Sequence, residues 1–132
     1  MPFVRISLRK GKSRAYLRAL SDSLHRALVE EFGVPSADRF QTILQHEPEE
    51  LVFDRDYLAG PRSDDFVLIA ITAGRVRSTA VKQRFYKRAV ALLAEAPGIR
   101  PEDVMIVVTT TGVDEWSFGN GEAQMVPALT DA

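Results

Sequence analysis

Residues 3–6 read Phe-Val-Arg-Ile and residues 66–69 read Phe-Val-Leu-Ile, so one apolar pattern occurs twice, 63 positions apart. Around the first copy, residues 2–8 alternate between apolar and polar side chains, which is typical of a strand with one buried face. Around the second copy, residues 65–72 are rich in β-branched side chains, which also predicts a strand. A repeat at this spacing indicates two copies of one supersecondary unit.

The residues after each copy strengthen this interpretation, because the same features follow in the same order. They are a glycine turn, a stretch with apolar residues at helical spacing, a helix breaker and a returning strand. In the first copy these are Gly11, 13–32, Gly33 with Pro35, and 40–45; in the second they are Gly74, 78–96, Pro97-Gly98 and 104–109.

We therefore predict an α/β (α+β) fold in a single domain. Its first β-α-β unit covers residues 2–46, a linker covers 47–64, and the second unit covers 65–110. A C-terminal segment with aromatic residues covers 111–132, and residues 51–53 are expected to add a short strand within the linker.

The predicted units also imply how the sheet is built. A right-handed crossover pairs the two strands of each unit in parallel. Two units side by side then give a four-stranded, mainly parallel sheet with both helices on one face. The apolar residues of the other face need a covering partner, which predicts a homo-oligomer.

Composition narrows the function. The chain has 132 residues, a formal net charge of −1 and no cysteine. The balanced charge argues against a nucleic-acid partner, and no apolar run is long enough to span a membrane. His25 and His46 lie far apart, so we expect no metal site, and we expect no cofactor. We expect a cytoplasmic protein.

Pro2 has two possible roles. It can simply open an edge strand, where its missing N–H is harmless. If Met1 is removed, however, its nitrogen becomes a free secondary amine. An α-amino group titrates at roughly 7.7 to 8.0, so either protonation state is usable for acid–base chemistry.

Arg75 and Arg77 lie where the third expected strand meets the second helix. Anionic ligands bind at the carboxyl ends of strands and at helix N-termini, and guanidinium groups bind carboxylates in bidentate fashion. The alternative is a pair of solvated arginines in a turn.

Three further residues are candidates for the site. Asp38 precedes the second strand and can either bond its own turn or carry chemistry. Trp116 and Phe118, beside two glycines, can anchor the core, contact a second subunit or wall a pocket.

Seven segments of the chain together resemble the tautomerase superfamily, and most closely its malonate semialdehyde decarboxylase branch. They run in order from residue 2 to about residue 124. They are Pro2; Phe32-Gly33-Val34-Pro35 with Asp38-Arg39-Phe40-Gln41; Gln45-His46-x-Pro48; Arg75-x-Arg77-Ser78; Phe85-Tyr86-Lys87; Gly98-Ile99-x-Pro101-x-Asp103-Val104; and Trp116-Ser117-Phe118-Gly119.

The resemblance implies a fold of two β-α-β units, a homotrimer, and catalysis by an amino-terminal proline. Carried onto this sequence, it implies Pro2 as the acid or base and Asp38 as the group that assists Pro2 or a water. It implies that Arg75 and Arg77 bind and polarise the carboxylate, and that Trp116 and Phe118 wall the pocket.

The function expected from these residues is acid–base catalysis on a small 3-oxo or 2-oxo acid, as in malonate semialdehyde decarboxylase. One alternative is a keto–enol tautomerase of the phenylpyruvate type. The other is a non-catalytic binding trimer. A nucleic-acid module built on the basic residues near the amino terminus is disfavoured, because no aromatic platform interleaves them.

Overall fold

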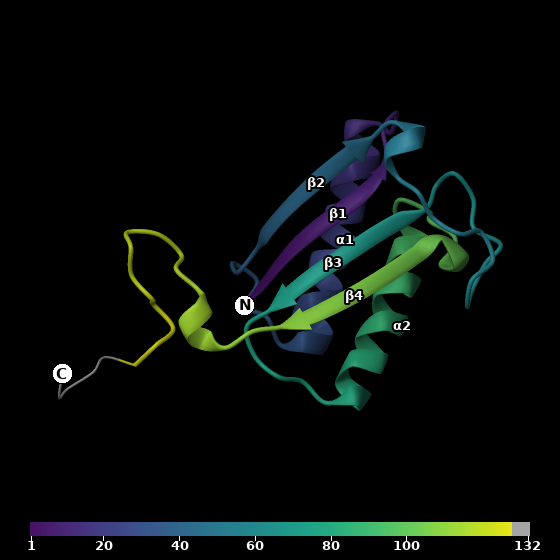
Figure 1. Cartoon of the computed structure of the whole chain (residues 1–132). Coiled ribbons are helices and arrows are strands. Elements are labelled where there is room, and N and C mark those ends of the chain that lie inside the picture. Colours follow the sequence, from purple (N-terminus) through teal and green to yellow (C-terminus); the bar gives the residue numbers. More distant parts are fainter. Residues whose placement is uncertain (128–132) are drawn as a thin grey trace.

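The computed structural model describes residues 1–127 of the chain. Its main elements run strand, helix, strand, and then repeat that order (Figure 1). They are β1 (Pro2–Arg9), α1 (Arg14–Phe32), β2 (Phe40–His46), β3 (Val67–Ala73), α2 (Thr79–Glu95) and β4 (Val104–Thr110). The short 3₁₀ helices are η1 (Pro48–Glu50), η2 (Pro101–Asp103) and η3 (Val113–Glu115).

The four strands form one sheet in the order β2-β1-β3-β4. Within each unit the strands are parallel, and the two units meet through the antiparallel pair β1 and β3, with Pro2 opposite Ala73. Both helices cover the same face (Figure 1). The predicted four-stranded, mainly parallel sheet with its helices on one face is confirmed.

This topology decides which chain ends meet. Because β1 and β3 are antiparallel, the first residue of β1 lies beside the last residue of β3. Because β3 and β4 are parallel, the end of β4 lies there too, so Ala73 is paired with Thr110. The amino terminus and the segments that follow β3 and β4 therefore gather at one end of the sheet.

The core lies between the sheet and the helices. The inward-facing residues of the two central strands are at most 2% exposed; they are Val4, Ile6, Leu8, Val67, Ile69 and Ile71. The helices contribute Leu24, Phe85 and Leu93, each 0% exposed. Burying one such side chain stabilises the fold by about 1.5–3 kcal/mol, so this layer holds the strand ends of the site in place.

The two helices begin in the same way, as the repeat predicts. The hydroxyl of Ser13 accepts a hydrogen bond from the Tyr16 amide (3.1 Å), and that of Ser78 accepts one from the Val81 amide (3.2 Å). Each hydroxyl satisfies one of the free amides at a helix start. Helix α1 ends at Gly33, whose φ of 67° requires the left-handed conformation that glycine adopts without strain.

The expectation of a strand over residues 51–53 is wrong, since these residues form no strand in the structure. The side chain of Leu51 is buried, and the ring of Phe53 stacks on Phe66 with centroids 4.2 Å apart. Leu51 and Phe53 therefore pack as side chains while Val52 is 90% exposed, and the backbone of this segment adds nothing to the sheet.

The end of the sheet away from the amino terminus is closed by polar contacts. Lys12, after β1, forms an ion pair with Asp65, before β3. Asp103, before β4, is fully buried and accepts a hydrogen bond of 2.6 Å from the amide of Ser63. The ion pair therefore joins the two units, and Asp103 fastens the linker to the second unit.

Within residues 1–127, nothing covers the sheet face away from the helices. Apolar side chains from both edge strands remain exposed on it, among them Leu44 (38%), Met105 (45%) and Val107 (44%). Among the described residues, no helix has both the length and the apolar character needed to cross a membrane.

Candidate functional site

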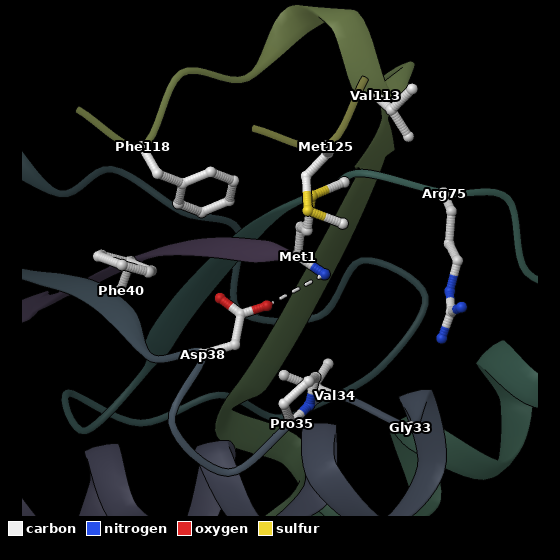
Figure 2. Close-up of a pocket in the computed structure, with 10 residues that line it drawn as sticks. All are labelled: Met1, Gly33, Val34, Pro35, Asp38, Phe40, Arg75, Val113, Phe118 and Met125. Atoms are coloured by element: carbon white, nitrogen blue, oxygen red, sulfur yellow. Dashed lines mark ion pairs between the residues drawn. The ribbon is translucent and has the colours of Figure 1, made fainter. Parts of the chain in front are cut away.

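A cavity of about 590 Å³ lies at the end of the sheet where the amino terminus meets the segments after β3 and β4 (Figure 2). Three parts of the chain build it: the amino terminus, the loop between α1 and β2, and the stretches after β3 and β4. The lining residues are Met1, Gly33, Val34, Pro35, Asp38, Phe40, Arg75, Val113, Phe118 and Met125.

Asp38 faces the amino terminus across this cavity. Its Oδ2 atom lies 3.3 Å from the Met1 nitrogen, and the two side chains are only 17% and 9% exposed (Figure 2). The turn after α1 positions this carboxylate, since the Asp38 amide donates to the Pro35 carbonyl at 3.0 Å. The second oxygen, Oδ1, is buried and has no hydrogen-bond partner in residues 1–127. The hydrogen-bonding capacity of this oxygen is therefore unused within the described residues.

Pro2 lies directly behind Met1. It is buried as the first residue of β1, and it is Met1 that lines the cavity. While Met1 is present, the Pro2 nitrogen is a tertiary amide without useful basicity. Removal of Met1 would leave the Pro2 nitrogen as the chain terminus at this end of the cavity.

Arg75 comes two residues after β3 and lines the cavity. Its side chain passes Gly33, where an added Cβ would lie 3.7 Å from the Arg75 Nη2 atom. Within residues 1–127 the Arg75 guanidinium takes part in no salt bridge, and Figure 2 shows it on the other side of Met1 from Asp38. A free cation at this position can bind a carboxylate.

Arg77 does not line the cavity, unlike its neighbour Arg75. Its Nη2 and Nε atoms donate to the Phe32 carbonyl at 3.0 and 3.3 Å, and Nη1 donates to the Arg75 carbonyl at 3.1 Å. Its guanidinium carbon lies 4.3 Å from the centroid of the Phe32 ring. Partial burial, followed by the charge of Arg75, lowers the pKa of Arg77. Arg77 therefore ties the end of α1 to the backbone of Arg75.

Phe118 and Trp116 contribute differently to the cavity wall. Phe118 lines it, with its ring centroid 5.7 Å from that of Phe40. Trp116 stacks behind Phe118 at 5.7 Å with an interplanar angle of 15°, and its indole N–H donates to the Thr111 hydroxyl at 2.7 Å. Trp116 therefore supports the wall, while Phe118 forms its surface.

Several apolar lining residues were not predicted from the sequence; they include Val34, Pro35, Phe40, Val113 and Met125. Phe40 opens β2 on the uncovered face and is 49% exposed, and its place two residues after Asp38 was a usable signal in the sequence. Val113 and Met125 lie after β4, where the sequence has no periodicity that would indicate their direction. In Figure 2, Val34 and Pro35 of the α1–β2 loop lie on one side of Met1, and Met125 is drawn toward the other side.

The site combines one carboxylate, one unpaired guanidinium and the chain terminus within apolar walls. Such walls strengthen the interactions of the polar groups by excluding water. No group of three or more histidine, aspartate or glutamate side chains with metal-binding geometry occurs among residues 1–127.

Two family models, each described as a tautomerase enzyme, match the chain over residues 38–119 and 2–59. The probable tautomerase YusQ of Bacillus subtilis (strain 168) is 40% identical over 96% of this chain and 99% of its own length. This chain belongs to the tautomerase superfamily. The predicted membership is thereby confirmed, and the probable tautomerase YrdN of the same organism is 31% identical over 96% of this chain and 97% of its own length.

Solved structures agree with this assignment. A crystal structure of malonate semialdehyde decarboxylase is 36% identical to this tautomerase-superfamily member, with a TM-score of 0.88 over 93% of this chain and 95% of the other. A fused 4-OT, described as a symmetric trimer, shares the fold with a TM-score of 0.76 at 17% identity, over 93% of this chain and 96% of the other. The closer similarity in both sequence and structure is to the decarboxylase.

Proposed function

We propose that this protein, once Met1 has been removed, is an enzyme that uses the Pro2 nitrogen for acid–base chemistry on a small 3-oxo or 2-oxo acid. The observation that carries the proposal is the meeting of the amino terminus, Asp38 and Arg75 in one cavity. The similarity to malonate semialdehyde decarboxylase favours a decarboxylation of that kind.

In this proposal each polar residue has one role. Arg75 binds the substrate carboxylate, since it lines the cavity and its guanidinium has no salt bridge among the described residues 1–127. Asp38 stabilises the cationic form of the terminal amine, because a carboxylate close to an amine favours its protonated state. Arg77 acts as a positioning residue through its bond to the Arg75 carbonyl, and Phe118, supported by Trp116, excludes water.

With malonate semialdehyde as substrate, the cationic Pro2 donates its proton to the aldehyde oxygen. The bond between the methylene carbon and the carboxylate breaks, its electron pair forms the enol double bond, and carbon dioxide leaves. The enol then takes a proton on carbon and returns its hydroxyl proton, which yields acetaldehyde. Preorganised charges that stabilise such an enolate-like state are worth about 3–4 kcal/mol each.

The second candidate is keto–enol tautomerisation of an arylpyruvate. It needs a neutral Pro2 that removes a proton from the carbon next to the carbonyl. The apolar lining favours it, because Phe40, Phe118 and Met125 offer an aromatic substrate a larger contact surface than malonate semialdehyde requires. The proximity of Asp38 to the terminus favours the cationic acid, and therefore we rank decarboxylation first.

We further propose that the functional unit is a homotrimer. The uncovered face of the sheet carries exposed apolar side chains on both edge strands, and a surface of this kind is usually covered by a partner. The fused 4-OT that shares this fold is described as a trimer.

Proton NMR of the processed protein with malonate semialdehyde, and separately with the enol of phenylpyruvate, tests the proposal. Pro2→Ala and Arg75→Ala are expected to lower the rate on the preferred substrate by about 10²-fold or more, the usual contribution of a positioned acid or base. Arg84→Ala, which removes an exposed arginine of α2 outside the cavity, is the matched control and keeps the wild-type rate. If Pro2→Ala and Arg75→Ala both keep full rates on both substrates, the proposed site is wrong.

A further inference from the structure

The backbone amide of Gly74 has a partner in this structure that processing would remove. Its nitrogen donates to the Met1 carbonyl oxygen at 2.9 Å. This bond continues the β1–β3 ladder one step beyond the pair formed by Pro2 and Ala73. Gly74 is buried at this point, at the end of β3. When Met1 is removed, the carbonyl oxygen leaves with it and the amide loses its acceptor.

A buried amide without a partner is unfavourable, so an oxygen from water or a ligand takes the vacated place. That place is fixed by covalent geometry. With C=O and C–N bonds of about 1.23 and 1.33 Å, the Met1 oxygen lies about 2.3 Å from the Pro2 nitrogen. The Gly74 N–H therefore points at a volume immediately beside the atom that becomes the free terminal amine.

The lack of a side chain at position 74 leaves room for the neighbouring space, which the Met1 side chain fills. A Cβ on Gly74 would lie 2.3 Å from Met1 Cε and 3.1 Å from Met1 Cβ, so it would point into the space that Met1 fills. Its φ lies outside the left-handed region, so backbone conformation does not require glycine here. Once Met1 is removed, the Trp116 Nε1 atom, 3.1 Å from such a Cβ, is the close neighbour that remains, so glycine leaves the space of Met1 open beside the indole.

We propose that the Gly74 N–H is a substrate-binding donor that holds the carbonyl oxygen of the oxo acid next to Pro2. The next residue, Arg75, then holds the carboxylate, so two neighbouring residues after β3 bind the two ends of the substrate. As the electron pair moves toward the carbonyl oxygen, the Gly74 amide stabilises its growing negative charge while Pro2 supplies the proton. This inference rests on the proposed function, because it takes the terminal amine as the acid.

Glycine-selective ¹⁵N labelling tests the inference without measuring turnover. The chain has eight glycines, and Gly74→Ala identifies the Gly74 signal by its loss. In protein that retains Met1, made with methionine aminopeptidase inhibited, the Gly74 amide should exchange slowly with solvent. In processed protein it should exchange faster, and 10 mM malonate, a non-reacting dicarboxylate probe, should slow the exchange and move the signal downfield. The amide of Gly98, which bonds the Leu93 carbonyl at 3.0 Å, is the internal control and stays unchanged.

The inference is overturned if the Gly74 amide is equally protected in both forms, or if malonate leaves its signal in place. A second measurement uses a backbone ester at position 74, with glycolic acid in place of glycine, which removes only the N–H. Loss of one oxyanion donor typically lowers kcat by about 10²–10³-fold, and we expect this loss with little change in KM. If the ester enzyme is fully active while Pro2→Ala is inactive, the Gly74 role is wrong and the proposed function stands. If Pro2→Ala is active as well, both are wrong.

Discussion

Replacing Arg77 with alanine separates a positioning role from direct substrate binding. The Arg77 guanidinium bonds the carbonyl oxygens of Phe32 and Arg75 and stacks on the Phe32 ring. Each carbonyl partner contributes about 1 kcal/mol, and the contact with the ring contributes about 0.5–1 kcal/mol. Arg77→Ala should therefore lower the free energy of unfolding by about 2–3 kcal/mol, which corresponds to a fall in Tm of about 6–12 °C for a domain of this size.

The matched variant is Arg75→Ala. The Arg75 guanidinium has no salt bridge within residues 1–127 and is exposed, so its loss should change Tm by less than about 2 °C, as is usual for surface substitutions. The assay is thermal unfolding followed by circular dichroism at one protein concentration, together with kcat and KM of each variant. We expect Arg75→Ala to be stable and nearly inactive, and Arg77→Ala to be less stable and partly active. A stable but inactive Arg77→Ala would refute the positioning role and indicate that Arg77 binds substrate directly.

Three other outcomes are expected. Phe118→Ala should raise KM for phenylpyruvate enol more than for malonate semialdehyde, because the lost ring serves the larger apolar substrate; equal changes would exclude this role. Asp38→Asn should move the pH–rate profile of decarboxylation to lower pH, because the cationic terminal amine loses its carboxylate partner, and an unchanged profile would contradict the pairing. Hydrogen bonds from Arg88 and, to a smaller extent, Arg26 lower the pKa of Glu30 from its ordinary 4.5. Wild type should therefore have a higher Tm than Glu30→Gln at neutral pH, and this difference should disappear as the pH falls below about 4. A Tm difference that stays constant with pH would contradict the pairing.

The fold was predictable from the sequence because the repeat occurs in strongly periodic segments. Apolar residues alternate around Val4 and Ile6, and again 63 positions later, because alternate side chains of these strands face the helices. Every inward position of the two strands is buried. The prediction of a strand at residues 51–53 was wrong because Leu51 and Phe53 pack their side chains without pairing their backbone. An apolar run of three residues does not distinguish side-chain packing from strand pairing.

The site was predictable only where strand ends fix a position. The meeting of the amino terminus with Asp38 and Arg75 follows from parallel pairing within each unit and the antiparallel junction. The direction of Arg77 was not predictable, because the segment between β3 and α2 has no regular period that would set where alternate side chains point. For the same reason, no pattern in the sequence indicates that Met125 lines the cavity.

The ion pair of Lys12 and Asp65 at the far end of the sheet shows that corresponding positions of the two units differ in charge pairing. A shift of 63 positions places Asp65 where Pro2 stands in the first unit and Lys12 where Arg75 stands in the second. The hydrogen bond to Asp65 raises the pKa of Lys12, so this counterpart of Arg75 stays cationic and already has a carboxylate as its partner. Lys12 is thus matched by a carboxylate within the chain, whereas the Arg75 guanidinium has no salt bridge within residues 1–127 and stays available to an anion from outside.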